Sequence, residues 1–140
     1  MHTIRLKRPW KRLVADGQQT DDHLVAKVDV PDLESDLPHA GIVHYQRSFN
    51  RPPQLDADEK MVLQIDHFSA QRITIQLNGT VLETHPKAGT TFPLQVDLTK
   101  VSAAFNQLSL ILESPAEQAI QLDGAVCLLI GNRQDFLPNV

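Results

Sequence analysis

Residues 73–79 read ITIQLNG, and this short segment decides the fold class of the chain. Its apolar side chains alternate with polar ones, which is the period of a strand with one buried face. The pair Asn78-Gly79 follows the alternation directly. Asn-Gly is a strong signal for a two-residue hairpin turn, because both residues tolerate positive φ angles. The segment therefore predicts a hairpin whose strands cover 73–77 and 80–85.

The same two-residue period recurs along the chain on both sides of this hairpin. It is clear in residues 94–98 (LQVDL) and present, less strictly, in residues 108–112 (LSLIL). Further strands are predicted over 3–7, 10–14, 23–30, 42–50, 60–67, 118–122 and 125–131. Residues 125–131 are apolar on both faces, so we expect them to form a central strand.

Turn chemistry separates the predicted strands. Asp16-Gly17 and Asp123-Gly124 predict tight turns. Pro52-Pro53 ends the strand before it, because proline cannot donate a hydrogen bond to a neighbouring strand. Residues 31–41 are predicted to form a loop, so the strands are short and closely spaced.

Helical patterns are nearly absent from the sequence. Residues 99–105 predict at most a helical turn or two, with Thr99 as the N-cap. Many short strands with frequent turns indicate an all-β antiparallel sandwich instead of a fold of alternating strands and helices. The length of 140 residues and the hydrophobic fraction of 41% are ordinary for one globular domain, so we expect a single domain over residues 1–140.

Cysteine usage and hydropathy indicate in which cellular compartment to expect the protein. The only cysteine, Cys127, lies in an apolar run, which favours a buried inert thiol over a nucleophile. The N-terminus lacks the apolar core of a signal peptide, and no stretch approaches the ~18 apolar residues of a membrane span. We therefore expect a soluble, cytoplasmic protein with no membrane partner.

The net charge of −4 is unevenly distributed. Residues 1–12 contain basic residues and no acidic one; the basic residues are Arg5, Lys7, Arg8, Lys11 and Arg12. A basic segment of this kind can contact nucleic acid, but the acidic remainder of the chain would repel a phosphate backbone. We favour a solvated strand and expect no nucleic-acid partner.

Several residues recur in an order that is typical of one known family. The strand over 42–50 contains Tyr45-Gln46-Arg47-Ser48-Phe49, an aromatic-x-Arg-x-Phe pattern, and the Asn78-Gly79 turn follows at a suitable distance. Later matches are Pro52, His85, Gly89, Phe92, Leu98-Thr99 and Asn106-Gln107-Leu108. In order and spacing these residues resemble the sugar-binding domain of glycoside hydrolase family two, a galactose-binding-like jelly roll.

The resemblance covers roughly residues 42–113 and leaves residues 1–40 without a match. It implies a jelly-roll sandwich that binds carbohydrate. The catalytic barrel of that family has no counterpart in this sequence, and the family uses the jelly roll as an accessory domain. The resemblance therefore implies a non-catalytic module instead of a hydrolase.

The matched residues have structural roles by their own physical chemistry. Tyr45, Arg47 and Phe49 share one strand face, which we expect to be buried. A buried guanidinium must be paired, and Asp97 or Glu83 are the candidate partners of Arg47. These residues, with Asn78 and Gly79 in the turn, are thus predicted to hold the fold.

Enzyme and metal motifs are missing from the sequence. No serine nucleophile elbow, phosphate loop, HExxH or paired CxxC occurs. His39 and His44 could meet Asp66-His67 in a metal site, although surface or core histidines are the simpler interpretation. A structural calcium could use either of two acidic runs, which are Asp56, Asp58 and Glu59, or Asp32, Glu34 and Asp36. Neither run has the spacing of a calcium loop, so we interpret these acids as solvated and predict no metal and no cofactor.

A ligand contact is predicted in the loop over 67–72. Sugar binding uses exposed aromatic rings together with planar polar groups. Tyr45, Phe49, Phe92 and Phe105 are expected to pack in the core. The loop cluster of His67, Phe68 and Arg72 is then the best candidate for ligand binding, and the competing interpretation is a Phe68 that folds back over the end of the sandwich.

Three functions are compatible with these observations. The first is a carbohydrate-binding module, which the family resemblance favours. The second is a protein-interaction or self-assembly module with no sugar ligand, which the scarcity of aromatic residues favours. The third is a small metal-dependent enzyme that uses the histidines. We expect the first, with the second as its close alternative, and no catalytic residue.

Overall fold

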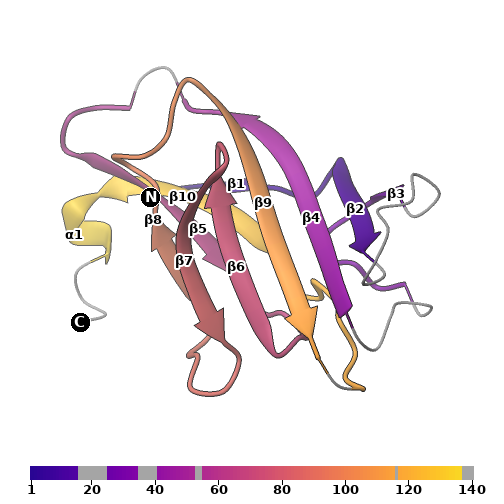
Figure 1. Ribbon diagram of the computed structural model, residues 1–140. Helices are drawn as coiled ribbons and strands as arrows, with labels where there is room; N and C mark the ends of the chain where they lie inside the picture. The colour runs from indigo at the N-terminus through magenta and orange to yellow at the C-terminus, as the bar shows by residue number, and fades with distance from the viewer. Residues whose placement is uncertain (16–24, 35–40, 53–54, 116, 137–140) are drawn as a thin grey trace.

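The computed structural model describes residues 1–15, 25–34, 41–52, 55–115 and 117–136. Within them the chain forms two antiparallel β-sheets packed face to face, which confirms the predicted all-β sandwich (Figure 1). The predicted turn at Asp16-Gly17 lies outside the described residues, as do His23, His39, Asp36 and Pro53.

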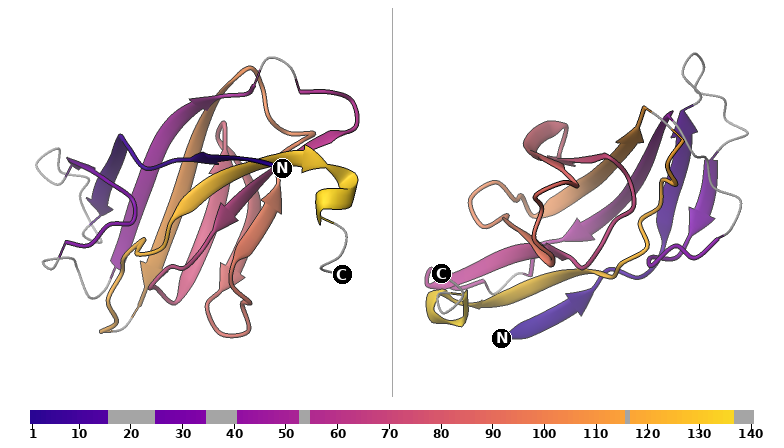
Figure 2. Two further views of the ribbon diagram at one scale, coloured as in Figure 1. Left: turned by 180° about the vertical axis from the view of Figure 1, so that it is seen from behind. Right: turned by 90° about the horizontal axis from the view of Figure 1, so that it is seen from below.

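The two sheets differ in size. Within the described residues, the larger sheet has six strands in the order β3 (Val25–Val28), β2 (Trp10–Ala15), β4 (Gly41–Asn50), β9 (Phe105–Ser114), β6 (Arg72–Leu77) and β7 (Thr80–Pro86). The smaller sheet has four, in the order β1 (His2–Arg5), β10 (Val126–Asn132), β5 (Glu59–Ile65) and β8 (Leu94–Asp97). The view from behind in Figure 2 places β1 and β10 in front of the larger sheet.

A short helix, α1 (Arg133–Phe136), follows β10 and has no counterpart in the sequence prediction. A hydrogen bond links the end of β10 to this helix, since the backbone N–H of Asn132 donates to Oδ2 of Asp135 at 2.8 Å. Within the described residues, no helix is long and apolar enough to cross a bilayer.

The Asn78-Gly79 hairpin forms as predicted. Asn78 has φ of 53° and Gly79 has φ of 83°, and Leu77 pairs with Thr80 across the turn. The Asn78 side chain adds a tether to β9, because its Oδ1 accepts a hydrogen bond from the backbone N–H of Gln107 at 2.8 Å. The turn therefore fixes both the β6–β7 hairpin and its register against the neighbouring strand.

The core lies between the two sheets and is built from alternate side chains of each strand. On β9, Leu108, Leu110 and Leu112 are fully buried, and on β6 the same is true of Ile73 and Ile75. Burying an aliphatic side chain of this size contributes roughly 1.5–3 kcal/mol. The two-residue period of the sequence thus reports directly which side chains face the core.

Strand β10 is buried on both faces and lies inside the smaller sheet, which confirms the central strand predicted from its apolar run. Its Cys127 is buried, as expected, and packs with Val62, Leu129 and Phe136 on the outer side of that sheet. Burial, together with the nearby charge of Asp66, raises the pKa of the Cys127 thiol, so little thiolate is present at neutral pH.

The prediction of a strand over 118–122 is wrong. This segment makes one isolated bridge, in which the backbones of Ser69 and Gln121 exchange hydrogen bonds of 2.7 and 2.8 Å. Ile120 and Leu122 are nevertheless fully buried. Their alternation arises because the segment crosses the end of the sandwich and inserts every second side chain into the core.

The predicted helical turn near 99–105 is a single turn, in which the N–H of Ser102 donates to the carbonyl of Leu98 at 3.0 Å. Thr99 is not its cap. The carboxylate of Asp97 instead accepts hydrogen bonds from the backbone N–H and the hydroxyl of Thr99, at 2.9 and 2.6 Å. The cap therefore lies two residues earlier than the sequence pattern indicated.

Phe105 does not pack in the core, and the prediction for it is wrong. It is 61% exposed, because buried positions on β9 fall at even numbers and Phe105 points outward. Tyr45 and Phe49 are buried as expected, whereas Phe92 is half-buried against the core.

The prediction of an ion pair between Arg47 and Asp97 or Glu83 is also wrong. Its guanidinium donates to the carbonyl oxygens of Ser48 (3.2 Å) and Arg8 (3.3 Å). Neither candidate carboxylate reaches it. Glu83 lies on β7, three strands away from β4 or roughly 14 Å, and Asp97 lies on β8 in the other sheet.

A buried charge cluster joins β2 and β4 to the segment after β3. Arg12 contacts Asp32 at 2.6 Å and Glu34 at 2.9 Å, and the hydroxyl of Tyr45 donates to Asp32 at 2.7 Å. The Arg12 side chain is 10% exposed and that of Asp32 only 1%. The solvated interpretation is therefore wrong for both of these residues, because Arg12 points inward from β2 and its charge requires a buried partner.

Candidate ligand-binding groove

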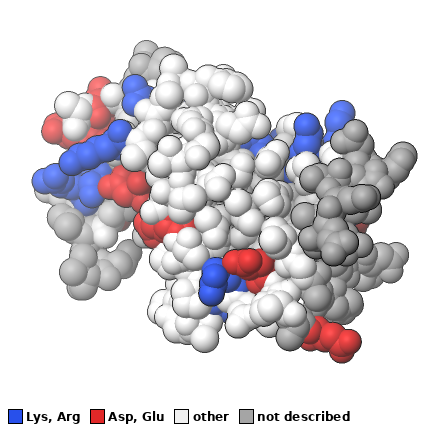
Figure 3. All heavy atoms as spheres, viewed as in Figure 1, with Lys and Arg blue, Asp and Glu red and all other residues white. Residues whose placement is uncertain are grey.

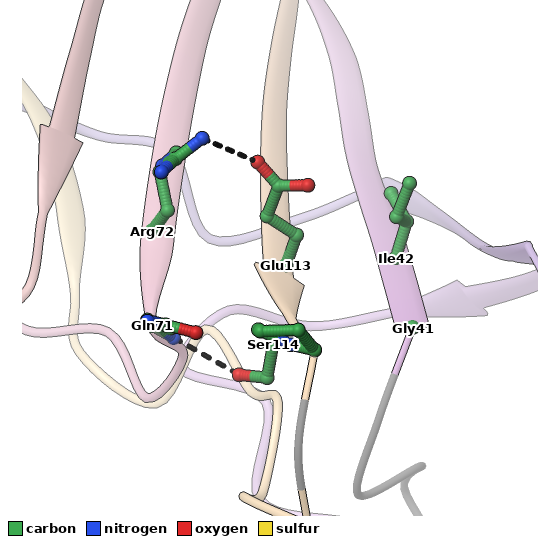
Figure 4. A pocket seen from close by; sticks show the side chains of 7 residues that line it. Gly41, Ile42, Gln71, Arg72, Glu113 and Ser114 are labelled. Atoms are coloured by element: carbon green, nitrogen blue, oxygen red, sulfur yellow. Dashed lines mark hydrogen bonds and ion pairs between the residues drawn. The ribbon is translucent and has the colours of Figure 1, made fainter.

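A groove of about 420 Å³ opens on the larger sheet where β4 begins and β9 ends. It is lined by Gly41, Ile42, Gln71, Arg72, Glu113, Ser114 and Pro115 (Figure 4). Strand pairing brings these residues together from three distant parts of the chain. Glu113 lies opposite Ile42 of β4 on one side and opposite Arg72 of β6 on the other.

The outward side chains of these strands form one row across the groove. Figure 4 shows Arg72 reaching toward Glu113, with Ile42 on the far side of the carboxylate. Nη1 of Arg72 and Oε1 of Glu113 are 3.5 Å apart, and the two side chains are 54% and 38% exposed. An exposed pair at this distance contributes little to stability, so both groups are able to exchange this contact for a ligand.

Gln71 completes the polar part of the groove. Its backbone N–H donates to the hydroxyl of Ser114 at 2.9 Å and to the carbonyl of Glu113 at 3.0 Å. Its backbone carbonyl accepts from the N–H of Lys87 at 2.8 Å. The main chain of Gln71 is thus fixed, while its exposed carboxamide makes no hydrogen bond to the other described residues.

Only one of the three predicted contact residues lines this groove. Arg72 does, but Phe68 is fully buried and packs edge-on against Phe92, with ring centroids 5.5 Å apart. The prediction of Phe68 as an exposed ring is therefore wrong, and the alternative in which it folds over the end of the sandwich is correct. The backbone bridge between Ser69 and Gln121 fixes the loop that contains Phe68.

His67 is held away from Arg72 by a separate polar cluster. Its Nδ1 lies 2.8 Å from Oδ1 of Asp123, and the hydroxyl of Ser69 donates to Oδ2 of the same carboxylate at 2.7 Å. The imidazole also lies tilted at 45° against the ring of Phe92, with the ring centroids 4.9 Å apart. Gly124 is required here, because a Cβ at this position would lie 2.2 Å from the backbone nitrogen of His67.

The sequence prediction missed Gln71, Ile42, Glu113 and Ser114. Each occupies an ordinary strand or strand-end position, and nothing in its own neighbourhood marks it as part of a site. Their proximity follows from the pairing of β4 with β9 and of β9 with β6, which local sequence patterns do not determine.

Metal ligation finds little support in the residues described. Among them, no three His, Cys, Asp or Glu side chains converge as a metal site would require. Asp32, one of the calcium candidates, is occupied by Arg12 and Tyr45. Burial lowers the pKa of His44, which lies on β4 and points to the outer face of the sheet.

No protein-family model and no curated protein matches the sequence, but solved structures match its fold. The Bifidobacterium dentium β-glucuronidase complexed with coumarin-3-O-glucuronide aligns with 94% of this chain and 30% of its own, at 19% identity and a TM-score of 0.72. An uncultured Clostridium sp. β-glucuronidase aligns over 94% and 29%, at 20% identity and a TM-score of 0.72. The Ruminococcus gnavus β-glucuronidase aligns over 94% and 29%, at 15% identity and a TM-score of 0.68.

These likenesses establish a shared fold. Identities between 15% and 20% do not transfer a function, because function depends on the site and not on the fold. The chain spans between 18% and 30% of the lengths of the glycosidases it resembles. It is thus a β-sandwich of a kind that these glycosidases contain as one part of a longer chain.

Proposed function

We propose that this chain is a non-catalytic carbohydrate-binding module, and that the groove between β4, β9 and β6 holds the sugar. The observation that carries the proposal is the row of Arg72, Glu113 and Gln71 beside Ile42, on a fold that β-glucuronidases share. The volume of about 420 Å³ is within the usual range of small-ligand sites, which is roughly 300–1,000 Å³.

The chemistry of the groove matches the surface of a sugar ring. Hydroxyl groups donate to the carboxylate of Glu113 and accept from the guanidinium of Arg72, and the carboxamide of Gln71 does both. Ile42 and Pro115 provide apolar walls for the C–H faces of the ring. Within the described residues the groove has no aromatic platform, so we expect weak binding of a short saccharide.

The absence of catalysis is part of the proposal. Glycoside cleavage ordinarily uses two carboxyl groups that flank the scissile bond, about 5–10 Å apart. Among the described residues that line the groove, Glu113 is the only carboxylate, and it faces Arg72. A single carboxylate next to a permanent cation supports binding and lacks the acid–base pair that hydrolysis needs.

The test is a titration of mono- and oligosaccharides, up to high millimolar concentration, followed by amide-resolved NMR. We expect shifts at the amides of Gln71, Arg72, Glu113 and Ser114. Arg72→Ala should weaken binding by roughly 10- to 100-fold, because hydrogen bonds to a charged group are worth about 1.5–3 kcal/mol. Arg5→Ala, an exposed arginine on β1 of the smaller sheet, is the matched control and should leave the affinity unchanged.

Two outcomes would count against the proposal. A flat response across the saccharide panel would favour the alternative of a protein-interaction or self-assembly module, which a concentration series of the mass in solution would then test. Shifts that spare the groove but follow another surface would retain sugar binding and remove the assigned site.

A further inference from the structure

The exposed ring of Phe105 has no role in the core of the sandwich. Among the described residues it is the only exposed aromatic side chain, since the other rings are buried or half-buried. An exposed ring offers a ligand a large apolar surface, which the C–H faces of a sugar can cover. The candidate groove lacks such a ring, so the place of Phe105 relative to the groove matters.

Phe105 lies on the same face of β9 as the groove. The side chains of β9 alternate between inward and outward positions, and the odd-numbered ones point outward. Glu113, which lines the groove, is eight residues further along the strand, or roughly 27 Å. Gln107, Ser109 and Ile111 lie between the two. One strand face therefore connects the groove to the exposed ring.

The neighbouring strands continue this face without a charged residue. The residues opposite these three positions are Ser48, Gln46 and His44 on β4, and Gln76 and Thr74 on β6. In this described part of the sheet none is Asp, Glu, Lys or Arg, although 21% of the chain is charged. Burial lowers the pKa of His44, so its imidazole is neutral at neutral pH. Figure 3 looks onto this face and shows a broad uncharged area over β6 and β9.

The side chains of this face suit a neutral ligand that carries hydroxyl groups. Gln107 is exposed and Gln46 and Gln76 are half-buried, so their carboxamides are accessible from solvent. A carboxamide both donates and accepts hydrogen bonds, as a sugar hydroxyl does. An ionic ligand would give up hydration on this face without gaining an opposite charge. Chemistry and charge thus favour a neutral saccharide over an acidic one.

We propose that the protein binds a linear, neutral oligosaccharide along the outer face of β9, from the groove at Glu113 to the ring of Phe105. The inference rests on the proposed function, because the groove supplies one end of the site. The short saccharide expected for the groove alone is then one end of a longer ligand. A second copy of the protein is disfavoured as the occupant, since sheets that pack face to face present apolar side chains to each other.

The probes are glucose, mannose and xylose, together with maltohexaose, cellohexaose, mannohexaose and xylohexaose. Each is titrated against the protein and followed by amide-resolved NMR. We expect at least one hexamer to bind about tenfold or more tightly than its monosaccharide, because it gains the contact with the ring. That hexamer should shift the amides of Phe105, Gln107 and Ser109 in addition to those of the groove, whereas the monosaccharide should shift the groove amides alone.

Variants at the far end of the face separate the ring from the groove. Phe105→Ala should weaken binding of that hexamer by about tenfold or more and change the affinity for its monosaccharide by less than about twofold. Phe105→Trp retains an aromatic surface and should preserve the affinity for the hexamer. Leu33→Ala is the matched control, because it shortens another exposed apolar side chain, on the segment after β3, and should change neither affinity. Amide spectra without sugar verify that each variant is folded.

The possible failures are distinguishable. Equal affinities for monosaccharide and hexamer, with shifts confined to the groove, would overturn this inference and leave the proposed function intact. The absence of shifts with every saccharide would overturn both. Unchanged binding of the hexamer to Phe105→Ala would remove the ring from the site and overturn the inference. Hexagalacturonate is the acidic counterpart, and tighter binding of it than of every neutral hexamer would overturn the assignment of a neutral ligand.

Discussion

At the scale of single residues, the buried contact of Arg12 with Asp32 is a feature that the sequence did not reveal. The two residues are 20 positions apart, and each belongs to a run of like-charged neighbours that reads as solvated surface. Asp32 accepts from Arg12 and from the hydroxyl of Tyr45, and that hydroxyl also accepts from the N–H of Leu122. The cluster thus joins β2, β4 and two loops at one end of the sandwich.

Removing Asp32 should be severely destabilising. Among the described residues, Asp32→Ala leaves the buried charge of Arg12 with only the partly exposed Glu34 as a partner, and breaking a buried pair in this way costs about 3–5 kcal/mol. The free energy of unfolding in urea measures the loss. Asp29→Ala is the matched control, because its pair with Arg8 is exposed and worth no more than about 1 kcal/mol. Equal losses in the two variants would disprove the special role of the buried pair.

The carboxylate of Asp123 gives the protein a predictable response to acid. Partial burial alone would raise the pKa of Asp123, but the hydrogen bonds from Ser69 and His67 outweigh it and lower the pKa. The unfolded state then binds a proton that the native state does not, in the interval below the unfolded pKa of about 3.9. The stabilisation is complete above that value and is lost as the pH falls through the lower native pKa.

Asp123→Asn should therefore reduce the acid sensitivity of folding. We expect its stability to fall less steeply than that of the parent protein below about pH 4, as measured by urea denaturation at a series of pH values. At neutral pH the same variant should be less stable than the parent, because its amide replaces the carboxylate that binds Ser69 and His67. Parallel pH profiles for the two proteins would contradict this assignment.

At the scale of elements, the β6–β7 hairpin shows what short sequence patterns determine well. Alternation and Asn-Gly are local signals, and the hairpin they predict forms with positive φ at both turn residues. The segment over 118–122 has a similar alternation but no strand partner over most of its length. Periodicity thus identifies which side chains are buried, and hydrogen-bonded neighbours decide whether the segment is a strand.

The turn glycine offers a test at this scale. Gly79→Ala places a Cβ at φ of 83°, where open space surrounds it but the backbone conformation is strained. We expect a loss of about 1 kcal/mol in the free energy of unfolding, since a left-handed conformation costs an L-residue about 1–2 kcal/mol. Thr80→Ala, the next residue and an exposed one, should change stability by no more than about 0.5 kcal/mol. A tolerated Gly79→Ala would show that the hairpin relaxes to another turn type.

At the scale of the whole molecule, strand register determines where the candidate groove lies. The candidate groove requires Ile42, Arg72 and Glu113 to be neighbours. The sequence alone predicted the sandwich, the central position of β10 and one groove residue, Arg72. It could not predict the rest, because pairing between distant strands is decided by the packing of the complete core.

The pairing of β1 with β10 has a consequence for how the chain is made. Ile4 pairs with Leu128, so a strand near the start of the sequence has its partner 124 positions later. Strand β4 likewise pairs with a strand that is made much later, β9, since Gly41 pairs with Ser114. Contacts of such long sequence separation make folding slow, on the order of milliseconds to seconds. During synthesis on a ribosome, the sandwich therefore cannot close until β10 has been made. Until then the early strands lack their partners and are exposed to aggregation in the cell.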